Sequence, residues 1–92
     1  MIGYLVGHAI GPNTLLTTGG VGYELAVLED LVVGDSYELW IHTYTSREGI
    51  SRLYGFVSLR EREVFAKIMA EKSVGPALAF KLLKGLGASE RP

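Results

Sequence analysis

Hydrophobic and polar residues alternate in short stretches along the first part of the chain, and glycine-rich segments separate these stretches. In the clearest stretch, Leu39 and Ile41 alternate with Glu38 and Trp40, which is the period of a strand with one buried face. Comparable stretches rich in β-branched and aromatic residues occur before and after it. The pattern predicts five short strands, at 2–10, 14–18, 23–28, 37–45 and 50–56.

Glycines inside these stretches predict how the strands are arranged. Glycine is costly in a strand interior, so Gly3 and Gly7 indicate a bend or the close approach of another backbone. Five short strands with such bends suit a small closed barrel of the OB (oligonucleotide/oligosaccharide-binding) type, which also removes exposed sheet edges. We predict this barrel over residues 1–57.

The hydrophobic period becomes helical in the second part of the chain. Ser58 and Glu61 have the spacing of a capping box, in which the hydroxyl caps the helix and the glutamate reaches back. Apolar residues then recur at helical spacing until the Ser-Val-Gly-Pro segment at 73–76. Pro76 suits the first turn of a second helix, which continues over 77–86.

These patterns together predict a mainly β chain with C-terminal α structure. A five-stranded OB-type barrel domain, 1–57, is followed by a partial helix-hairpin-helix domain, 58–92. Two short helices cannot bury both of their apolar stripes by themselves. We therefore expect the helices to pack on the barrel, on further sequence or on another subunit.

Composition narrows the classes of function. The 92 residues contain no cysteine, which excludes a disulfide scaffold, a cysteine zinc site and a thiol nucleophile. No apolar run approaches the roughly 20 residues of a membrane span, and the first residues lack the basic leader of a signal peptide. We expect a cytoplasmic protein without a membrane partner.

The formal net charge of −1 conceals an asymmetry along the chain. Residues 1–57 carry two basic and six acidic side chains, a balance of −4. Residues 58–92 carry seven basic and four acidic side chains, a balance of +3. An acidic part joined to a basic part suggests that the two parts have different tasks.

No constellation of catalytic or metal-binding residues is visible. His8 and His42 are isolated, with no acid or cysteine at ligand spacing, and are interpreted as ordinary strand residues. The glycines at 19–22 lack the lysine and the helix that follow a phosphate loop. We expect no catalytic residue, no metal site and no cofactor.

The segment between the two predicted helices is the most informative. A tight turn there points backbone N–H groups outward beside the start of the second helix, where partial positive charge suits a phosphate oxygen. Such a site holds the DNA backbone without reading bases, and nearby lysines add salt-sensitive affinity. A plain helical turn with solvated lysines explains the same residues equally well. The candidate DNA-binding residues are Lys72, Ser73, Val74, Gly75, Ala77, Lys81 and Lys84.

Two further features each have a functional and a structural interpretation. Tyr37, Trp40 and Tyr44 lie on or near one predicted strand, and aromatic residues on OB surfaces stack bases. Because basic residues are absent nearby, core packing or subunit contact is the simpler interpretation. The polar tip at 47–49, between two strands, is by itself an ordinary solvated turn.

Taken together, these segments resemble the RuvA family, the Holliday-junction-binding subunits of the bacterial branch-migration complex. Five motifs occur in the order typical of that family and cover nearly the whole chain. No single motif is decisive, but the ordered set is highly specific. The motifs are MIGYLVG at 1–7, GGVGYE at 19–24, RE followed by LYGF at 47–56, EREVF at 61–65, and VGP with two apolar pairs at 74–83.

The resemblance implies a non-catalytic, structure-selective DNA-binding protein. Family members form four-fold tetramers with the barrels at the centre of a flat face, where hairpin backbones grip the phosphates of four DNA arms. The resemblance assigns the turn at 47–49 to an acidic pin, with Glu48 as its remaining acid, that repels phosphates at the crossover. The implied partners are four-way junction or duplex DNA, further copies of the chain, and an ATPase motor of the RuvB type.

Several departures from the family pattern weaken the expected grip or guidance of DNA. Gly49 stands where a second acid is usual, Ser73 replaces the first hairpin glycine, and Ala77 replaces a lysine beside the phosphate site. The second helix-hairpin-helix and the motor-binding domain of the family have no counterpart in these 92 residues. We therefore do not expect the chain as it stands to drive branch migration.

The sequence leaves three hypotheses open. The first is sequence-independent binding at four-way (Holliday) junctions within a RuvA-like complex for branch migration and recombinational repair. The second is a truncated homologue that serves as an oligomerisation or protein-interaction scaffold with little DNA affinity of its own. The third is single-strand binding on the aromatic barrel face, which predicts quenching of Trp40 fluorescence by oligonucleotides.

Overall fold

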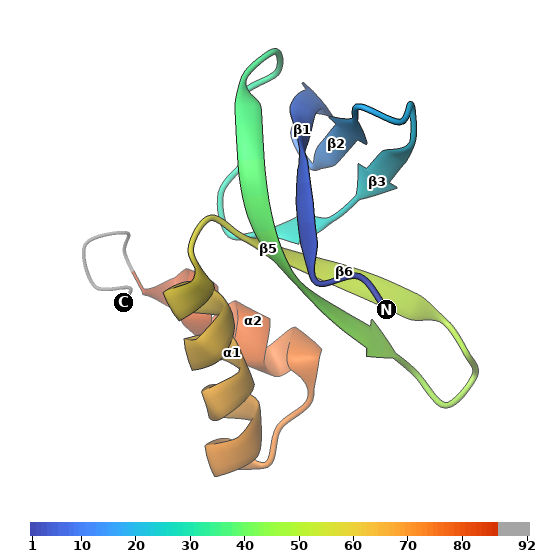
Figure 1. Ribbon diagram of the computed structural model, residues 1–92. Coiled ribbons are helices and arrows are strands. Elements are labelled where there is room, and N and C mark those ends of the chain that lie inside the picture. Colours follow the sequence, from blue (N-terminus) through green and yellow to red (C-terminus); the bar gives the residue numbers. More distant parts are fainter. Residues whose placement is uncertain (87–92) are drawn as a thin grey trace.

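The computed structural model of the chain describes residues 1–86, and the end of the second predicted domain, 87–92, lies outside the described residues. Within that range, six strands precede two helices, so the predicted class of mainly β with C-terminal α is confirmed (Figure 1). The elements are β1 (Tyr4–Gly11), β2 (Thr14–Thr17), β3 (Gly22–Glu24), β4 (Ala26–Val27), β5 (Ser36–Thr45), β6 (Ser51–Phe56), α1 (Leu59–Lys72) and α2 (Pro76–Gly85).

The strands form one sheet in the order β3-β2-β1-β5-β6-β4. At one end of this order β3 pairs antiparallel with β2, and at the other end β4 pairs parallel with β6. Only Leu25 separates β3 from β4, so the segment 22–27 joins both edges and closes the sheet into a barrel. This is the OB-type arrangement predicted from the sequence.

The prediction of a single third strand over 23–28 is wrong, because β3 and β4 replace it. Leu25, between them, is buried in the barrel, and its amide donates a hydrogen bond of 2.8 Å to the carbonyl of Asn13. This bond helps to turn the chain from the β2 edge to the β6 edge. The alternation of hydrophobic and polar residues cannot predict this break between β3 and β4, because the break depends on which other strands the two halves pair with.

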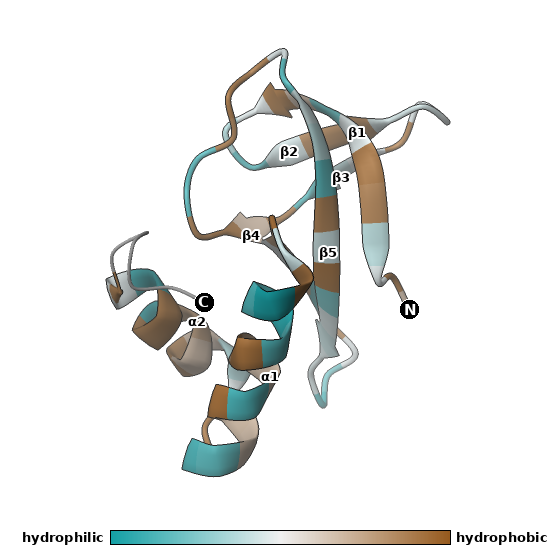
Figure 2. Cartoon of the chain, turned by 60° about the vertical axis from the view of Figure 1, so that its left-hand side comes forward, coloured by the Kyte–Doolittle hydropathy of each residue, from teal (hydrophilic) through white to brown (hydrophobic). Residues whose placement is uncertain are grey.

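Alternation along β1 and β5 fills the barrel with small and aliphatic side chains. Leu5 and Ala9 of β1 are buried with Leu39 and Ile41 of β5 in one cluster. Figure 2 shows the pattern as alternating hydrophobic and hydrophilic bands along β5. Each fully buried leucine or isoleucine stabilises the fold by about 1.5–3 kcal/mol relative to exposure. This cluster is the main source of barrel stability.

The helices pack on the outside of the barrel against β6. Phe65 of α1 is completely buried, and its ring centroid lies 5.1 Å from that of Phe56 and 5.2 Å from that of Tyr54. Ala79 and Leu83 of α2 are buried in the same cluster. The sequence left open what covers the apolar stripes of the helices. In the structure, the apolar stripe of each helix packs against β6 and against the other helix.

The first turn of α1 contains half of the predicted capping box. The Ser58 hydroxyl accepts a hydrogen bond of 3.1 Å from the Glu61 amide. The prediction that Glu61 reaches back is wrong: its side chain is buried, and Oε1 has no hydrogen-bond partner in the described part of the chain. Packing of α1 on the barrel directs this side chain inward, where it lines a small hollow with Leu28 and Leu31.

Candidate nucleic-acid interface

The turn between α1 and α2 begins with a residue in the left-handed conformation. Ser73 ends α1 with φ 51° and ψ 44°, which costs an L-residue about 1–2 kcal/mol and which glycine adopts readily. The amides of Ser73 and Val74 both donate to the Met69 carbonyl, Val74 at 3.2 Å. These two donors therefore complete the end of α1 and do not face outward.

The start of α2 leaves backbone donors free. Gly75 supplies no side-chain cap, Pro76 has no N–H group, and the first turn contains no acid. Consequently the amides of Gly75, Ala77 and Leu78 have no acceptor within residues 1–86, and all three residues are exposed. Free amides at the positive end of a helix dipole form a favourable site for an anion such as a phosphate.

The candidate lysines are distributed over both helices. Lys72 lies in the last turn of α1, whereas Lys81 and Lys84 lie along α2 on the same flank as Ala77. All three lysine side chains are exposed, and none takes part in an ion pair among the described residues. The structure thus brings Lys81 and Lys84 together, with Lys72 on the other helix of the hairpin.

The predicted acidic pin is the tip of the β5–β6 hairpin, which projects away from the helices (Figure 1). The Ser46 amide donates to the Ile50 carbonyl at 2.9 Å, and the Gly49 amide donates to the Ser46 carbonyl at 3.0 Å. Gly49 has φ 83°, a left-handed conformation that glycine adopts without strain. Glu48 is exposed and forms no ion pair in the part of the chain that the structure describes.

The aromatic residues of β5 do not form one open platform. Tyr37 packs against the barrel core, and its hydroxyl accepts a hydrogen bond of 2.8 Å from the Val32 amide. Trp40 contacts the ring of Tyr4 at a centroid distance of 4.8 Å, and the guanidinium carbon of Arg62 lies 5.3 Å from its ring centroid. Because the protein itself occupies the Trp40 ring, this arrangement disfavours base stacking on Trp40.

Arg62 makes a structural contact that the sequence analysis missed. Its Nη1 donates to the carbonyl of Gly3 at 2.9 Å and to that of Ile41 at 3.3 Å, which ties α1 to β5 and to the start of β1. Next to it, His42 packs edge-on against Phe65, and burial followed by the charge of Arg62 lowers the pKa of His42. The spacing of apolar residues in a helix cannot indicate this contact, because both acceptors are backbone carbonyls that lie far from Arg62 in the sequence.

The described residues contain neither a metal-binding cluster nor a membrane-spanning helix. Between residues 1 and 86, no group of three or more side chains is arranged to hold a metal ion. Neither helix in that part of the chain is long and apolar enough to cross a membrane. The chemistry that the described surface offers therefore consists of backbone donors, charged side chains and apolar patches.

Comparisons with known proteins show which family the chain belongs to. A family model described as RuvA N terminal domain matches residues 1–55. The chain is 37% identical to a protein of Halothermothrix orenii over 94% of its own length, 39% identical to one of Solibacter usitatus over 86%, and 38% identical to one of Shewanella denitrificans over 98%. Each relative is named Holliday junction branch migration complex subunit RuvA. The matches cover 47%, 43% and 48% of these relatives, so the chain spans about half the length of the curated relatives it matches. With its motifs, its barrel and these matches in agreement, the chain belongs to the RuvA family.

Proposed function

We propose that this chain binds four-way (Holliday) junction DNA in a structure-selective, sequence-independent way, as a non-catalytic part of a RuvA-like branch-migration and repair complex. The α1–α2 turn carries the proposal. Its free amides at Gly75, Ala77 and Leu78 sit on helices that are packed firmly on β6. Backbone amides bind phosphate oxygens whatever the base sequence, so such a turn recognises where the DNA backbone runs.

The two parts of the chain have different tasks in this proposal. The barrel, 1–57, carries the acidic pin at Glu48, which keeps phosphates away from the crossover. The part that follows the barrel, 58–92, holds the DNA arm, and Val74 contributes by shaping the turn because its amide is used within α1. The proposed DNA-binding residues are Lys72, Ser73, Val74, Gly75, Ala77, Lys81 and Lys84.

The symmetry of the ligand suggests how copies of the chain assemble. A four-way junction has four equivalent arms, so a tetramer with four-fold symmetry presents one α1–α2 turn to each arm. The relatives are named as subunits of a branch migration complex. We propose that the chain acts as such a tetramer in the bacterial cytoplasm, beside an ATPase motor of the RuvB type that supplies the energy for strand movement.

One observation favours a protein-interaction scaffold as a second candidate function. Leu78 and Leu82 lie on the flank of α2 that the barrel does not cover, and they are 48% and 43% exposed. Exposed apolar side chains grouped on one helix flank suit contact with another protein chain. A scaffold of this kind co-assembles with a longer relative and binds DNA weakly by itself.

The proposed function predicts that the chain binds a four-way junction more tightly than a linear duplex of equal length. We expect a difference of at least about tenfold, which corresponds to about 1.4 kcal/mol. Both affinities should fall steeply as salt rises, because phosphate contacts release counterions. Fluorescence anisotropy measures both affinities. Equal affinities contradict junction selectivity, whereas absent DNA binding together with co-assembly with a full-length relative, seen by light scattering, supports the scaffold.

Removing the charge of the acidic pin is expected to tighten junction binding. Glu48→Gln abolishes a repulsion with phosphates that amounts to about 1 kcal/mol at 4 Å in water, or about a fivefold change in affinity. Glu63→Gln removes another exposed carboxylate, on α1, and should leave the affinity nearly unchanged. The same anisotropy titration compares the two variants. An equal response of both shows that Glu48 does not face the crossover.

A further inference from the structure

A groove of about 560 Å³ runs between the barrel and one flank of α2. Asn13 in the β1–β2 turn and Arg52 in β6 line its barrel side, and Lys81 and Lys84 line its helix side. Ala77, whose amide is free, lines it as well, so the groove adjoins the backbone donors at the start of α2. We call this feature the α2 groove.

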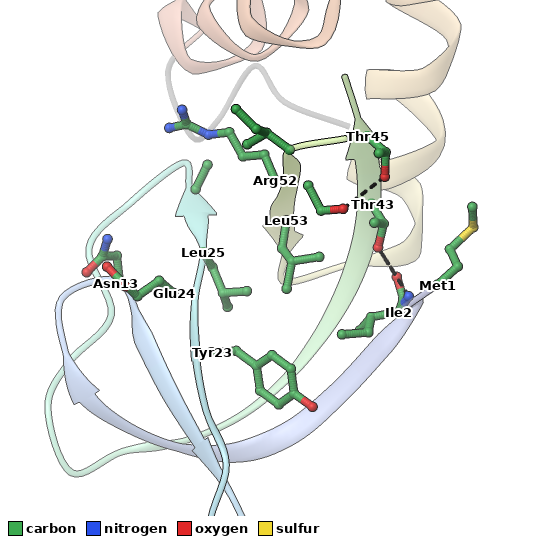
Figure 3. Close-up of a pocket in the computed structure, with 13 residues that line it drawn as sticks. Met1, Ile2, Asn13, Tyr23, Glu24, Leu25, Thr43, Thr45, Arg52 and Leu53 are labelled. Carbon is green, nitrogen blue, oxygen red and sulfur yellow. Dashed lines mark hydrogen bonds between the residues drawn. The ribbon is translucent and has the colours of Figure 1, made fainter. Parts of the chain in front are cut away.

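A second hollow, of about 910 Å³, lies beside the α2 groove at the mouth of the barrel (Figure 3). The two hollows are neighbours, since Asn13, Leu25 and Arg52 line both. Figure 3 shows Arg52 extending from β6 toward the side on which the helices lie. The second hollow reaches Thr45 and Ser51, which pair beside the β5–β6 turn. Arg52 therefore borders both the hollow beside the β5–β6 turn and the α2 groove.

The α2 groove has an excess of positive charge. Arg52, Lys81 and Lys84 line it, against one carboxylate, that of Asp30. None of the three cations forms an ion pair within the described residues. Uncompensated cations that share a groove repel one another and attract anions, and the low-dielectric walls of the groove concentrate their field. The ligand that suits the groove is therefore a polyanion.

The positions of the cations suit a chain of phosphates. Lys81 and Lys84 are three residues apart on one flank, or about 4.5 Å along the helix axis. Successive phosphates of one DNA strand are about 3.4 Å apart along the duplex axis, so two flexible lysines can reach neighbouring phosphates. On the opposite wall, the guanidinium carbon of Arg52 lies 5.7 Å from the ring centroid of Tyr54. A guanidinium anchored in this way can donate two parallel hydrogen bonds to a phosphate.

We propose that the α2 groove binds the phosphodiester backbone of DNA through Arg52, Lys81 and Lys84. The proposal rests on the proposed function, since it takes DNA as the ligand, and it adds a barrel residue, Arg52, to the residues that hold DNA. The β5–β6 hairpin then has two electrostatic roles. Glu48 in the turn repels phosphates, and Arg52, which pairs with Tyr44 just beyond the turn, attracts them. A backbone that Glu48 keeps away from the tip meets Arg52, Lys81 and Lys84 in the α2 groove.

The test measures how the removal of each cation changes DNA affinity and its salt dependence. A labelled linear duplex and a labelled four-way junction are titrated with the chain and its variants by fluorescence anisotropy at several salt concentrations. Arg52→Gln removes one phosphate contact, so we expect both affinities to fall about eightfold at about 0.1 M salt and the slope of log affinity against log salt to become shallower by about 0.9. The double variant K81Q/K84Q is expected to lose about twice that slope.

Two control variants separate the groove from other effects. Lys67→Gln removes the same charge from the exposed surface of α1, where Lys67 pairs with Glu71, and should change the affinity by less than about twofold. Arg52→Lys keeps the charge and should retain most of the salt slope, even where contact with Tyr54 is lost. Urea unfolding curves establish that each variant is folded before its affinity is compared.

The outcomes distinguish this proposal from the proposed function. Unchanged affinity and slope in R52Q overturn the groove as a DNA site, whether or not the junction is preferred. Equal wild-type affinity for junction and duplex, with R52Q weakening both, supports the groove and contradicts junction selectivity. A chain that binds neither DNA, or that binds polyglutamate more tightly than DNA, overturns the groove proposal and assigns the cations to another partner or to none.

Discussion

Replacing Phe65 by alanine is expected to lower the free energy of unfolding by about 3–5 kcal/mol. The ring is completely buried, and its centroid lies 5.1 Å from that of Phe56, 5.2 Å from those of His42 and Tyr54, and 6.1 Å from that of Phe80. Truncation removes contacts with all four rings and leaves a cavity that close-packed neighbours fill only in part. At about 0.05–0.15 kcal/mol per residue, a chain of this length is stable by about 5–14 kcal/mol, so this change removes a large share of the stability.

Leu78→Ala provides the control for this substitution, because Leu78 is 48% exposed on the outer flank of α2. Its removal should cost about 1 kcal/mol or less. Urea unfolding followed by circular dichroism measures both variants. We also expect F65A to lose the preference for junction DNA, because helices that leave the barrel no longer hold the α1–α2 turn in place. A cost for F65A below about 1.5 kcal/mol would show that the helices do not pack on β6 in solution.

Replacing Gly7 by alanine is expected to cost about 3 kcal/mol. A Cβ atom at this position lies 2.2 Å from the carbonyl oxygen of Leu16 and 2.8 Å from its carbonyl carbon, both backbone atoms of β2. Gly7 is paired with Thr17 in the β1–β2 ladder, so the clash is relieved only by separating two strands of the barrel. The prediction that glycines in the first stretch mark a close approach of backbone is confirmed at Gly7.

Gly19→Ala is the matched control, since an added Cβ at Gly19 meets nothing within 4 Å. Its effect on the free energy of unfolding should stay within about 0.5 kcal/mol. The two alanine variants are compared by their urea midpoints and by the slopes of their transitions. Similar midpoints for G7A and G19A contradict the close contact of β1 with β2, and a changed slope shows that the unfolded or folded state itself has altered.

Strands and helices whose pattern is local were predictable from the sequence. The period of two in 37–45 corresponds to β5, and the helical period interrupted at 73–76 corresponds to α1, the turn and α2. Each of these signals lies within one contiguous segment, so no distant partner is needed to read it. The family resemblance rests on the same kind of contiguous motif, and the match to the RuvA N terminal domain confirms it.

Features that depend on distant partners were missed. The strand predicted over 23–28 splits at Leu25 because two different strands pair with its two halves. Glu61 turns inward because the barrel covers the start of α1. Arg62 finds its acceptors in the backbone at Gly3 and Ile41. In the candidate site, the turn and its lysines were predicted, whereas the place of Arg52 opposite Lys81 was not.

The sequence by itself determined the class of strands followed by helices, the turn at 73–76 and the family, because each of these is encoded by neighbouring residues. Only the tertiary structure decided which amides of the turn remain free and which cations share one groove. Hydrogen bonds and buried contacts join residues that are far apart in the sequence. The packing of the folded chain therefore sets which amides stay free and which charged side chains lie close together. In this protein the barrel places Arg52 across the α2 groove from Lys81 and Lys84, and that arrangement exists only once β6 and α2 have come together.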